Sequence, residues 1–80
     1  MVLPKLVDYH INRLKDKNPD VRLKAIRELE LLGDAGALEA LKSVFEQDED
    51  VDVRKAAQEA GRVIFLKHKQ QGATNSPATP

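Results

Sequence analysis

The sequence predicts an all-α protein, an α-solenoid in which about four helices stack side by side. The phrase DVRLKA, which begins at Asp20, returns as DVRKAA at Asp52, 32 residues later. A structural unit of about 30 to 34 residues that repeats in tandem is typical of a solenoid. In addition, four stretches carry apolar residues at the spacing of one helical face. At 80 residues the chain makes one small domain.

The first two predicted helices cover residues 4–15 and 19–32. In the second, Asn18 is a good N-cap, Pro19 fits the first helical position, and Gly33 suits the left-handed residue that ends a helix. The apolar face of the first helix consists of Leu3, Leu6, Val7, His10, Ile11 and Leu14. The inner face of the second consists of Val21, Ala25, Leu29 and Leu32, with Ile26 beside it.

The third predicted helix covers residues 35–47, is capped by Asp34, and follows the second after only one or two residues. These two helices are therefore expected to form an antiparallel hairpin, with single helices before and after it. The apolar side of the third helix consists of Leu38, Leu41, Val44 and Phe45.

Asp50 is expected to cap the fourth helix, which starts at residue 51 and ends at Lys67 or Lys69. The segment that follows, QQGATNSPATP, contains no charge and no large apolar residue. Such a composition predicts a helical domain over residues 1–69 and a disordered tail over residues 70–80.

The composition excludes several classes of protein. The 13 basic and 13 acidic residues cancel, whereas a nucleic-acid-binding domain usually carries a positive excess, so the balance argues against that partner. There is no cysteine, which removes disulfides and thiolate metal sites. No segment approaches the ~20 apolar residues of a membrane span or contains a signal-peptide core. The protein is therefore expected to be soluble and cytoplasmic.

The two copies align over most of a helix at an offset of 32 residues. The segment from Asn18 to Ile64 resembles the short bacterial-type HEAT repeats, whose pattern is Asp-x-x-Val-Arg-x-x-Ala, then Leu-Gly, Gly-Asp and Ala-Leu-x-x-Leu. The residues that match it are Val21, Arg22, Ala25, Leu29, Gly33, Asp34, Ala37, Leu38, Ala40 and Leu41 in the first copy, and Val53, Arg54 and Ala57 in the second.

This resemblance implies protein binding as the default role. Repeats of this kind occur in the phycobilin lyases and related cyanobacterial phycobilisome factors, so the resemblance also suggests association with a photosynthetic complex. The lyases are much longer arrays that hold a bilin. The HEAT-repeat deoxyhypusine hydroxylases bind iron through His-Glu pairs, which neither His10-Ile11 nor His68-Lys69 supplies. No metal and no cofactor is therefore expected.

The repeated Asp-Val-Arg has a structural interpretation. The valine is expected to be buried, and the acid to lie at the positive end of a helix. The arginine can reach acceptors in the adjacent turn or repeat, so Arg22 and Arg54 are expected to form a ladder with acids such as Asp20 and Asp52. The alternative is that these arginines bind a phosphate or an acidic partner.

The acidic turn resembles a calcium loop only superficially. Asp48, Asp50, Asp52 and Glu59 occupy positions 1, 3, 5 and 12 of an EF-hand frame, but Val53 stands where that loop requires glycine. These acids are expected to cap and solvate the turn; the alternative is an acidic patch that steers a basic partner.

The two histidines do not indicate an enzyme. His10 lies on an apolar face and is expected to pack half buried with one hydrogen bond, whereas His68 is expected to be solvated. Because the histidines lie at opposite ends of the chain, no catalytic set can be assembled from them. No catalytic residue is therefore expected.

The copies differ most where ELLGD of the first becomes VIFLK in the second. Phe65 and Leu66 are expected to point partly out of the stack, and with the basic Arg62 and Lys69 they are the candidate partner-binding residues. Because the ends of a solenoid need covering, this helix is expected to mediate a homodimer or to dock on another protein's helix. The alternative is that it caps its own core.

These observations favour a small non-catalytic protein-binding adaptor or assembly factor. Two other functions stay open at the level of sequence. One is a bilin-binding factor related to the lyases, and the other is a nucleic-acid-binding HEAT-like module.

Overall fold

Four α-helices and one short 3-10 turn make up the described part of the chain. The computed structural model describes the backbone of residues 3–75 and the side-chain surroundings of residues 6–69. The helices are α1 (Leu3–Arg13), α2 (Pro19–Leu32), α3 (Leu38–Gln47) and α4 (Val51–Asn75), and the turn η1 covers Ala35–Ala37. The prediction of an all-α stack is confirmed, and residues 3–75 contain no strand.

Two side chains cap the helices that begin with the repeated phrase. The Asn18 Oδ1 accepts a hydrogen bond of 2.9 Å from the Asp20 N–H. The Asp50 Oδ1 accepts bonds of 2.8 Å from the Asp52 N–H and 3.1 Å from the Val53 N–H. Each cap satisfies a backbone donor that has no partner inside its helix. The predicted starts of α2 and α4 are therefore confirmed.

Gly33 ends α2 in the left-handed conformation, with a φ of 66°, and its N–H donates to the Leu29 carbonyl at 3.0 Å. Asp34 then accepts a bond of 2.7 Å from the Gly36 N–H and so begins η1. A glycine adopts a positive φ without the steric cost that a Cβ would bring. The predicted role of Gly33 is confirmed. Asp34 caps η1 and not α3, which begins only at Leu38, three residues later than predicted, and has no side-chain cap.

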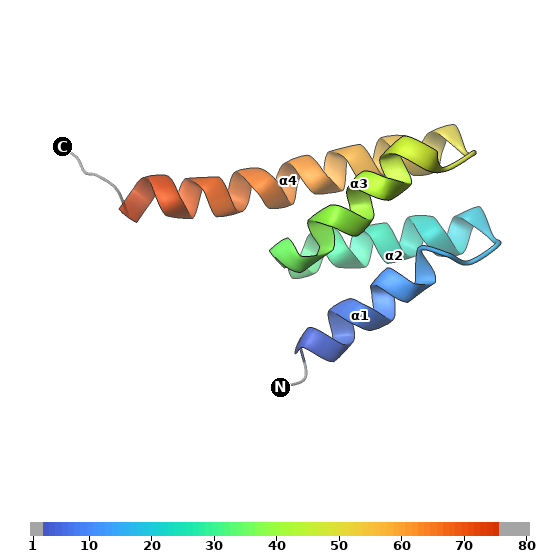
Figure 1. Ribbon diagram of the computed structural model, residues 1–80, viewed down its shortest axis with the longest axis horizontal. Coiled ribbons are helices and arrows are strands. Elements are labelled where there is room, and N and C mark those ends of the chain that lie inside the picture. The colour runs from blue at the N-terminus through green and yellow to red at the C-terminus, as the bar shows by residue number, and fades with distance from the viewer. Residues whose placement is uncertain (1–2, 76–80) are drawn as a thin grey trace.

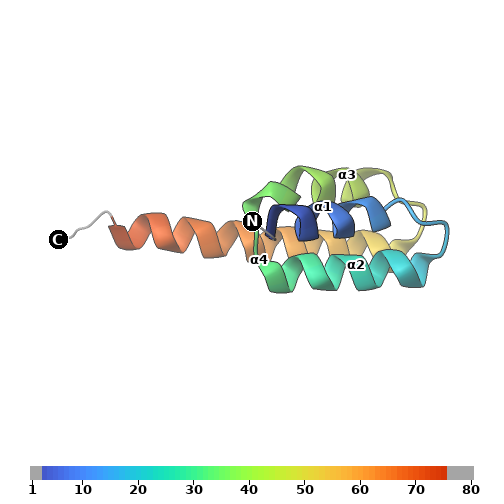
Figure 2. The ribbon, with the colours of Figure 1, turned by 90° about the horizontal axis from the view of Figure 1, so that it is seen from below.

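The helices pair as two hairpins, α1 with α2 and α3 with α4. Figure 1 shows α2 beside α4, and Figure 2 shows α1 and α3 together in the other layer. The expected hairpin of the second and third helices is therefore wrong, because the structure contains two complete hairpins. The left-handed Gly33 and the η1 turn redirect the chain, so that α3 crosses over to pack along α4.

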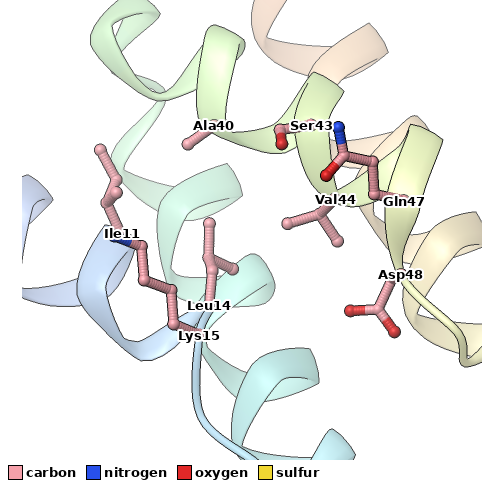
Figure 3. A pocket seen from close by; sticks show the side chains of 8 residues that line it. All are labelled: Ile11, Leu14, Lys15, Ala40, Ser43, Val44, Gln47 and Asp48. Carbon is pink, nitrogen blue, oxygen red and sulfur yellow. The ribbon is translucent and has the colours of Figure 1, made fainter.

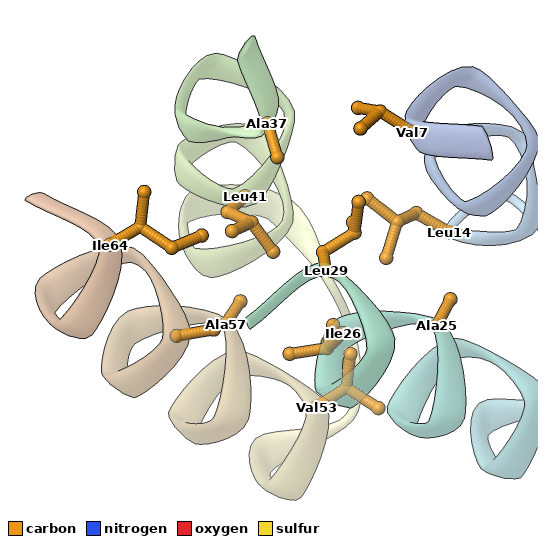
Figure 4. Packing of buried hydrophobic residues seen from close by; sticks show 11 residues of the cluster. Val7, Leu14, Ala25, Ile26, Leu29, Ala37, Leu41, Val53, Ala57 and Ile64 are labelled. Atoms are coloured by element: carbon orange, nitrogen blue, oxygen red, sulfur yellow. The ribbon is translucent and has the colours of Figure 1, made fainter. Parts of the chain in front are cut away.

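The core lies between the two layers, where side chains from all four helices meet (Figure 4). The sequence predicts Val21 inside, but this residue is only half buried, as is Leu32, whereas Val53 at the equivalent position of the second copy is fully buried. The first hairpin covers Val53, whereas no hairpin among the described residues is stacked on the side of the first hairpin that carries Val21. The buried residues are Val7, Leu14, Ala25, Ile26, Leu29, Ala37, Leu41, Val53, Ala57, Ala60 and Ile64.

α4 is longer than expected. Its 25 residues span about 37 Å, against about 21 Å for the 14 residues of α2, and its end projects past the other helices (Figure 2). The expected disorder is wrong for residues 70–75, which continue the helix. Gln70 and Gln71 are good helix formers, and a Ser-Pro pair follows the helix only after Asn75. Residues 76–80 and the Leu3 side chain lie outside the described residues.

Replacing Leu29 with alanine is expected to lower the free energy of unfolding by about 2–5 kcal/mol, because it leaves a cavity in the core. Leu31→Ala on the same helix is the matched control. The Leu31 side chain is 77% exposed, so this change should alter the free energy of unfolding by less than about 0.5 kcal/mol. Urea unfolding followed by circular dichroism measures both values. Equal effects at the two positions would contradict the described core.

Candidate functional site

The two arginines of the repeated phrase, Arg22 and Arg54, each donate hydrogen bonds to backbone carbonyl groups in the turn of their own hairpin. The Arg22 Nη1 donates to the carbonyl oxygens of Asp16 at 2.8 Å and Lys17 at 3.1 Å. The Arg54 Nη1 lies 2.7 Å from the Asp48 carbonyl oxygen and 3.4 Å from that of Glu49. Every partner in the second set lies 32 residues after its counterpart in the first. The repeat in sequence is thus a repeat of atomic contacts.

The other edge of the Arg22 guanidinium joins the two hairpins. Its Nη2 donates to the Asp48 Oδ1 at 3.0 Å, and its Nε lies 2.8 Å from the Asp48 Oδ2, an ion-pair contact in which the N–H is not aligned as a hydrogen bond. The two side chains are only 13% and 8% exposed. This pair confirms the interpretation of Arg22 as a contact between repeats.

The acid that completes this contact differs from the expected one. Asp20 and Asp52 are exposed in the first turns of α2 and α4, whereas Asp48 lies in the α3–α4 turn, which the stacking of the hairpins brings beside Arg22. The Asp48 Oδ1 also accepts a bond of 2.9 Å from the Asp50 N–H. The expected ladder through Asp20 and Asp52 is therefore wrong.

The acidic turn is organised around helix caps and an ion pair. Asp50 caps α4, Asp48 pairs with Arg22, and the chain is helical from Val51 onward. Within the described residues, no group of three or more His, Cys, Asp or Glu side chains is arranged to hold a metal ion. The turn thus has the geometry of a structural element.

Both histidines have the expected exposure, but their polar contacts differ from expectation. His10 is half buried and packs its ring edge-on against Tyr9, with ring centroids 5.1 Å apart, but its buried Nδ1 has no hydrogen-bond partner among the described residues. The predicted hydrogen bond is therefore not made by this nitrogen. His68 is exposed as expected, and its Nε2 also lies 2.9 Å from the Gly33 carbonyl oxygen at the end of α2.

An apolar groove of about 290 Å³ lies between α3 and α4 on the side of the second hairpin that faces away from the first. We call this surface the C-terminal face. Phe65 is 55% exposed and lines the groove with Phe45, which is 40% exposed. The residues that form the face are Leu38, Leu41, Lys42, Phe45, Ala57, Gln58, Gly61, Arg62 and Phe65.

The structure brings only two of the four candidate binding residues together on this face. Phe65 and Arg62 line the groove, whereas Leu66 and Lys69 do not. Phe45 and Gly61 belong to the groove but are not among the candidates that the sequence suggests. Periodicity along the third helix predicts Phe45 on the inner side, and only the packing of α3 along α4 shows that its ring reaches the edge.

Arg62 is held at the rim of the groove by Glu59, with 2.9 Å between the Arg62 Nη2 and the Glu59 Oε2. The hydrogen bond from Arg62, and then its charge, lower the pKa of Glu59. Stability from this pair is present above the ordinary pKa of a glutamate and is lost as the pH falls through the lowered pKa. Because both side chains are exposed, the contribution is small.

A second groove, also of about 290 Å³, runs between α1 and α3 in the other layer (Figure 3). Figure 3 shows that Ile11 of α1 and Leu14, just after that helix, face Ala40 and Val44 of α3 across it, and Asp48 lies at one end. Both grooves are at the lower limit of the roughly 300–1,000 Å³ typical of small-molecule sites. Their size suits side chains of another protein better than a large cofactor.

Stacked helical hairpins that repeat the same turn contacts define an α-solenoid. The family model described as HEAT repeats matches residues 3–61, which covers α1 to α3 and the first part of α4. The chain belongs to the HEAT repeat family. No curated protein and no solved structure matches it. Among the described helices, none has both the length and the apolar character needed to cross a lipid bilayer.

The pairing of Arg22 with Asp48 is expected to be cooperative. Arg22→Ala should lower the free energy of unfolding by about 3 kcal/mol, because it removes the clasp and leaves the Asp48 carboxylate unpaired. In a cycle with Asp48→Asn, the coupling energy should reach about 1–3 kcal/mol. Arg27→Ala, an exposed position on the same helix, is the control. Urea unfolding of the four proteins of the cycle measures the coupling energy. If the effects of the two substitutions on the free energy of unfolding are additive, Arg22 and Asp48 do not form a stabilising contact between the hairpins.

Proposed function

We propose that this chain is a small non-catalytic adaptor or assembly factor that binds protein through its C-terminal face. HEAT repeats generally mediate protein interactions, and this chain belongs to that family. The specific surface is suggested by the exposed apolar groove between α3 and α4, which Phe65 lines.

One observation carries this proposal: equivalent positions of the two hairpins differ in what covers them. On α2, Ile26 and Leu29 are fully buried beneath the second hairpin. On α4 the equivalent residues are Gln58 and Gly61, which line the open groove. The C-terminal face is thus a stacking surface without its cover among the described residues. An exposed apolar surface bordered by polar residues is typical of a protein interaction site.

The non-catalytic part of the proposal is supported by the use of the polar side chains. Arg22, Arg54 and Asp48 hold the turns, and Asp50 caps a helix. Neither the groove between α1 and α3 nor the groove between α3 and α4 is lined by a histidine. The charged groups that face them, such as Lys42 and Arg62, can select a partner but do not form a catalytic set.

The biological setting is proposed from the repeat alone. The Asp-Val-Arg pattern at Asp20 and Asp52 resembles the repeats of the phycobilin lyases and related phycobilisome factors. We place the adaptor in a phycobilisome or another photosynthetic complex on that ground. Binding of a free bilin would instead indicate a lyase-related factor, and a spectral shift of the bilin on mixing would reveal it.

Phe65→Asp is expected to abolish partner binding while the protein stays folded, because it places a charge at an exposed position that lines the apolar groove. Leu66→Asp, at the neighbouring position outside the groove, should keep the partner. Both variants and the wild-type chain are immobilised and exposed to extract from the cells that produce the protein, and the retained proteins are compared by mass spectrometry. A folded Phe65→Asp variant that keeps every partner would show that this face is not the binding surface.

A further inference from the structure

We infer that a second copy of this chain docks its first hairpin on the C-terminal face, so that copies stack head to tail and the solenoid continues from one chain into the next. This inference rests on the proposed function, because it names the occupant of the same face. Its template is the contact between the two hairpins inside one chain.

The two ends of the molecule carry complementary halves of the contact that joins the hairpins. The Arg54 Nη1 clasps its own turn as Arg22 does, but the described residues supply no carboxylate to the remaining edge of the Arg54 guanidinium. Asp16 is the counterpart of Asp48 and has the same turn geometry, since its Oδ1 accepts a bond of 2.9 Å from the Asn18 N–H. Stacking a second copy by the internal repeat places its Asp16 carboxylate beside Arg54.

The head-to-tail contact would also bring together two exposed apolar residues, Leu31 of one copy and Phe65 of the other. Val63 and Lys67 lie four positions apart on one side of α4, and the Lys67 side chain lies 3.0 Å from where a Cβ of Gly33 would be. This side of α4 therefore faces α2. Leu31 is the counterpart of Val63 and is 77% exposed. Head-to-tail stacking brings the exposed Leu31 of one copy toward the exposed Phe65 of the next.

At the internal interface a large side chain on α2 adjoins a small one on α4. In the head-to-tail contact the large side chain would come from α2 of the second copy and the small one from α4. Inside the chain, Leu29 of α2 and the small Ala60 of α4 are both buried where the helices adjoin. At the ends, the counterparts are Gly61 and Glu28. A Cβ on Gly61 would meet no other side chain within 4 Å, so this position leaves open space that admits the longer Glu28 side chain of a second copy.

A symmetric dimer through α4 fits less well. Pairing two C-terminal faces brings Lys42 and Arg62 of one copy against a face that carries the same two basic residues. Only Arg62 has an acidic side-chain partner among the described residues. Like charges that face each other oppose association, whereas the head-to-tail contact pairs opposite charges. A head-to-tail contact is also open, so it produces chains or rings of copies instead of stopping at two.

The test uses two variants that each block one end. Leu31→Asp blocks the face that carries Asp16 and leaves the C-terminal face intact. Phe65→Asp blocks the C-terminal face and leaves the face that carries Asp16 intact. The wild-type chain should show a mass that rises with concentration beyond a dimer in sedimentation experiments reaching about 1 mM. Each variant alone should remain a monomer. An equimolar mixture should form a discrete pair and no larger species, because only one productive contact remains.

The ion pair is tested separately with Asp16→Asn, which keeps the acceptor for the Asn18 N–H but removes the charge. This variant should weaken association about tenfold, and the matched charge change Asp20→Asn should not. A wild-type chain that stays monomeric overturns the inference, and so does a dimer that Leu31→Asp leaves intact. If the chain is monomeric but Phe65→Asp alone loses a captured protein, head-to-tail assembly is rejected and the proposed function stands. If Phe65→Asp changes neither the self-association of the chain nor the capture of another protein, head-to-tail assembly and the proposed function are both rejected.

Discussion

The ion pair between Arg22 and Asp48 is the contact on which the relative placement of the two hairpins depends. One planar guanidinium donates along one edge to the turn of its own hairpin and along the other to a carboxylate of the next. The fixed fork of an arginine suits this double role, which the single ammonium group of lysine could not reproduce. Because both side chains are largely buried, loss of either partner would leave the other charge buried and unpaired, which is strongly destabilising.

Equivalent arginines have different surroundings in the two described hairpins. Arg22 holds the carbonyl groups of its own turn and also pairs with Asp48 of the next hairpin, whereas Arg54 holds the equivalent turn carbonyls and has no carboxylate partner among the described residues. Solenoid repeats contact only their neighbours, so the last repeat offers the surface that an inner repeat buries. The positions that form the contact between the two hairpins on α2 are therefore equivalent to the positions that form the C-terminal face on α4.

The small core links stability to binding. Four of the buried residues are alanines, Ala25, Ala37, Ala57 and Ala60, which permit close approach of the helices but bury little apolar area each. A chain of 80 residues gains only modest stability from a core of this kind. A partner that covers Phe65 and Phe45 would extend the core and, by mass action, stabilise the folded chain.

The sequence alone determined the features that depend on neighbours along the chain. The Asn18 and Asp50 caps and the left-handed Gly33 were predictable, because each rests on hydrogen bonds or backbone preferences within a few residues. The 32-residue repeat is visible in the sequence itself. The tertiary structure decided the pairing of α3 with α4 and the choice of Asp48 as the partner of Arg22. It also decided which of Phe65, Leu66 and Phe45 share a groove. These outcomes depend on the direction in which the chain leaves Gly33, and periodicity along a single helix carries no information about that direction.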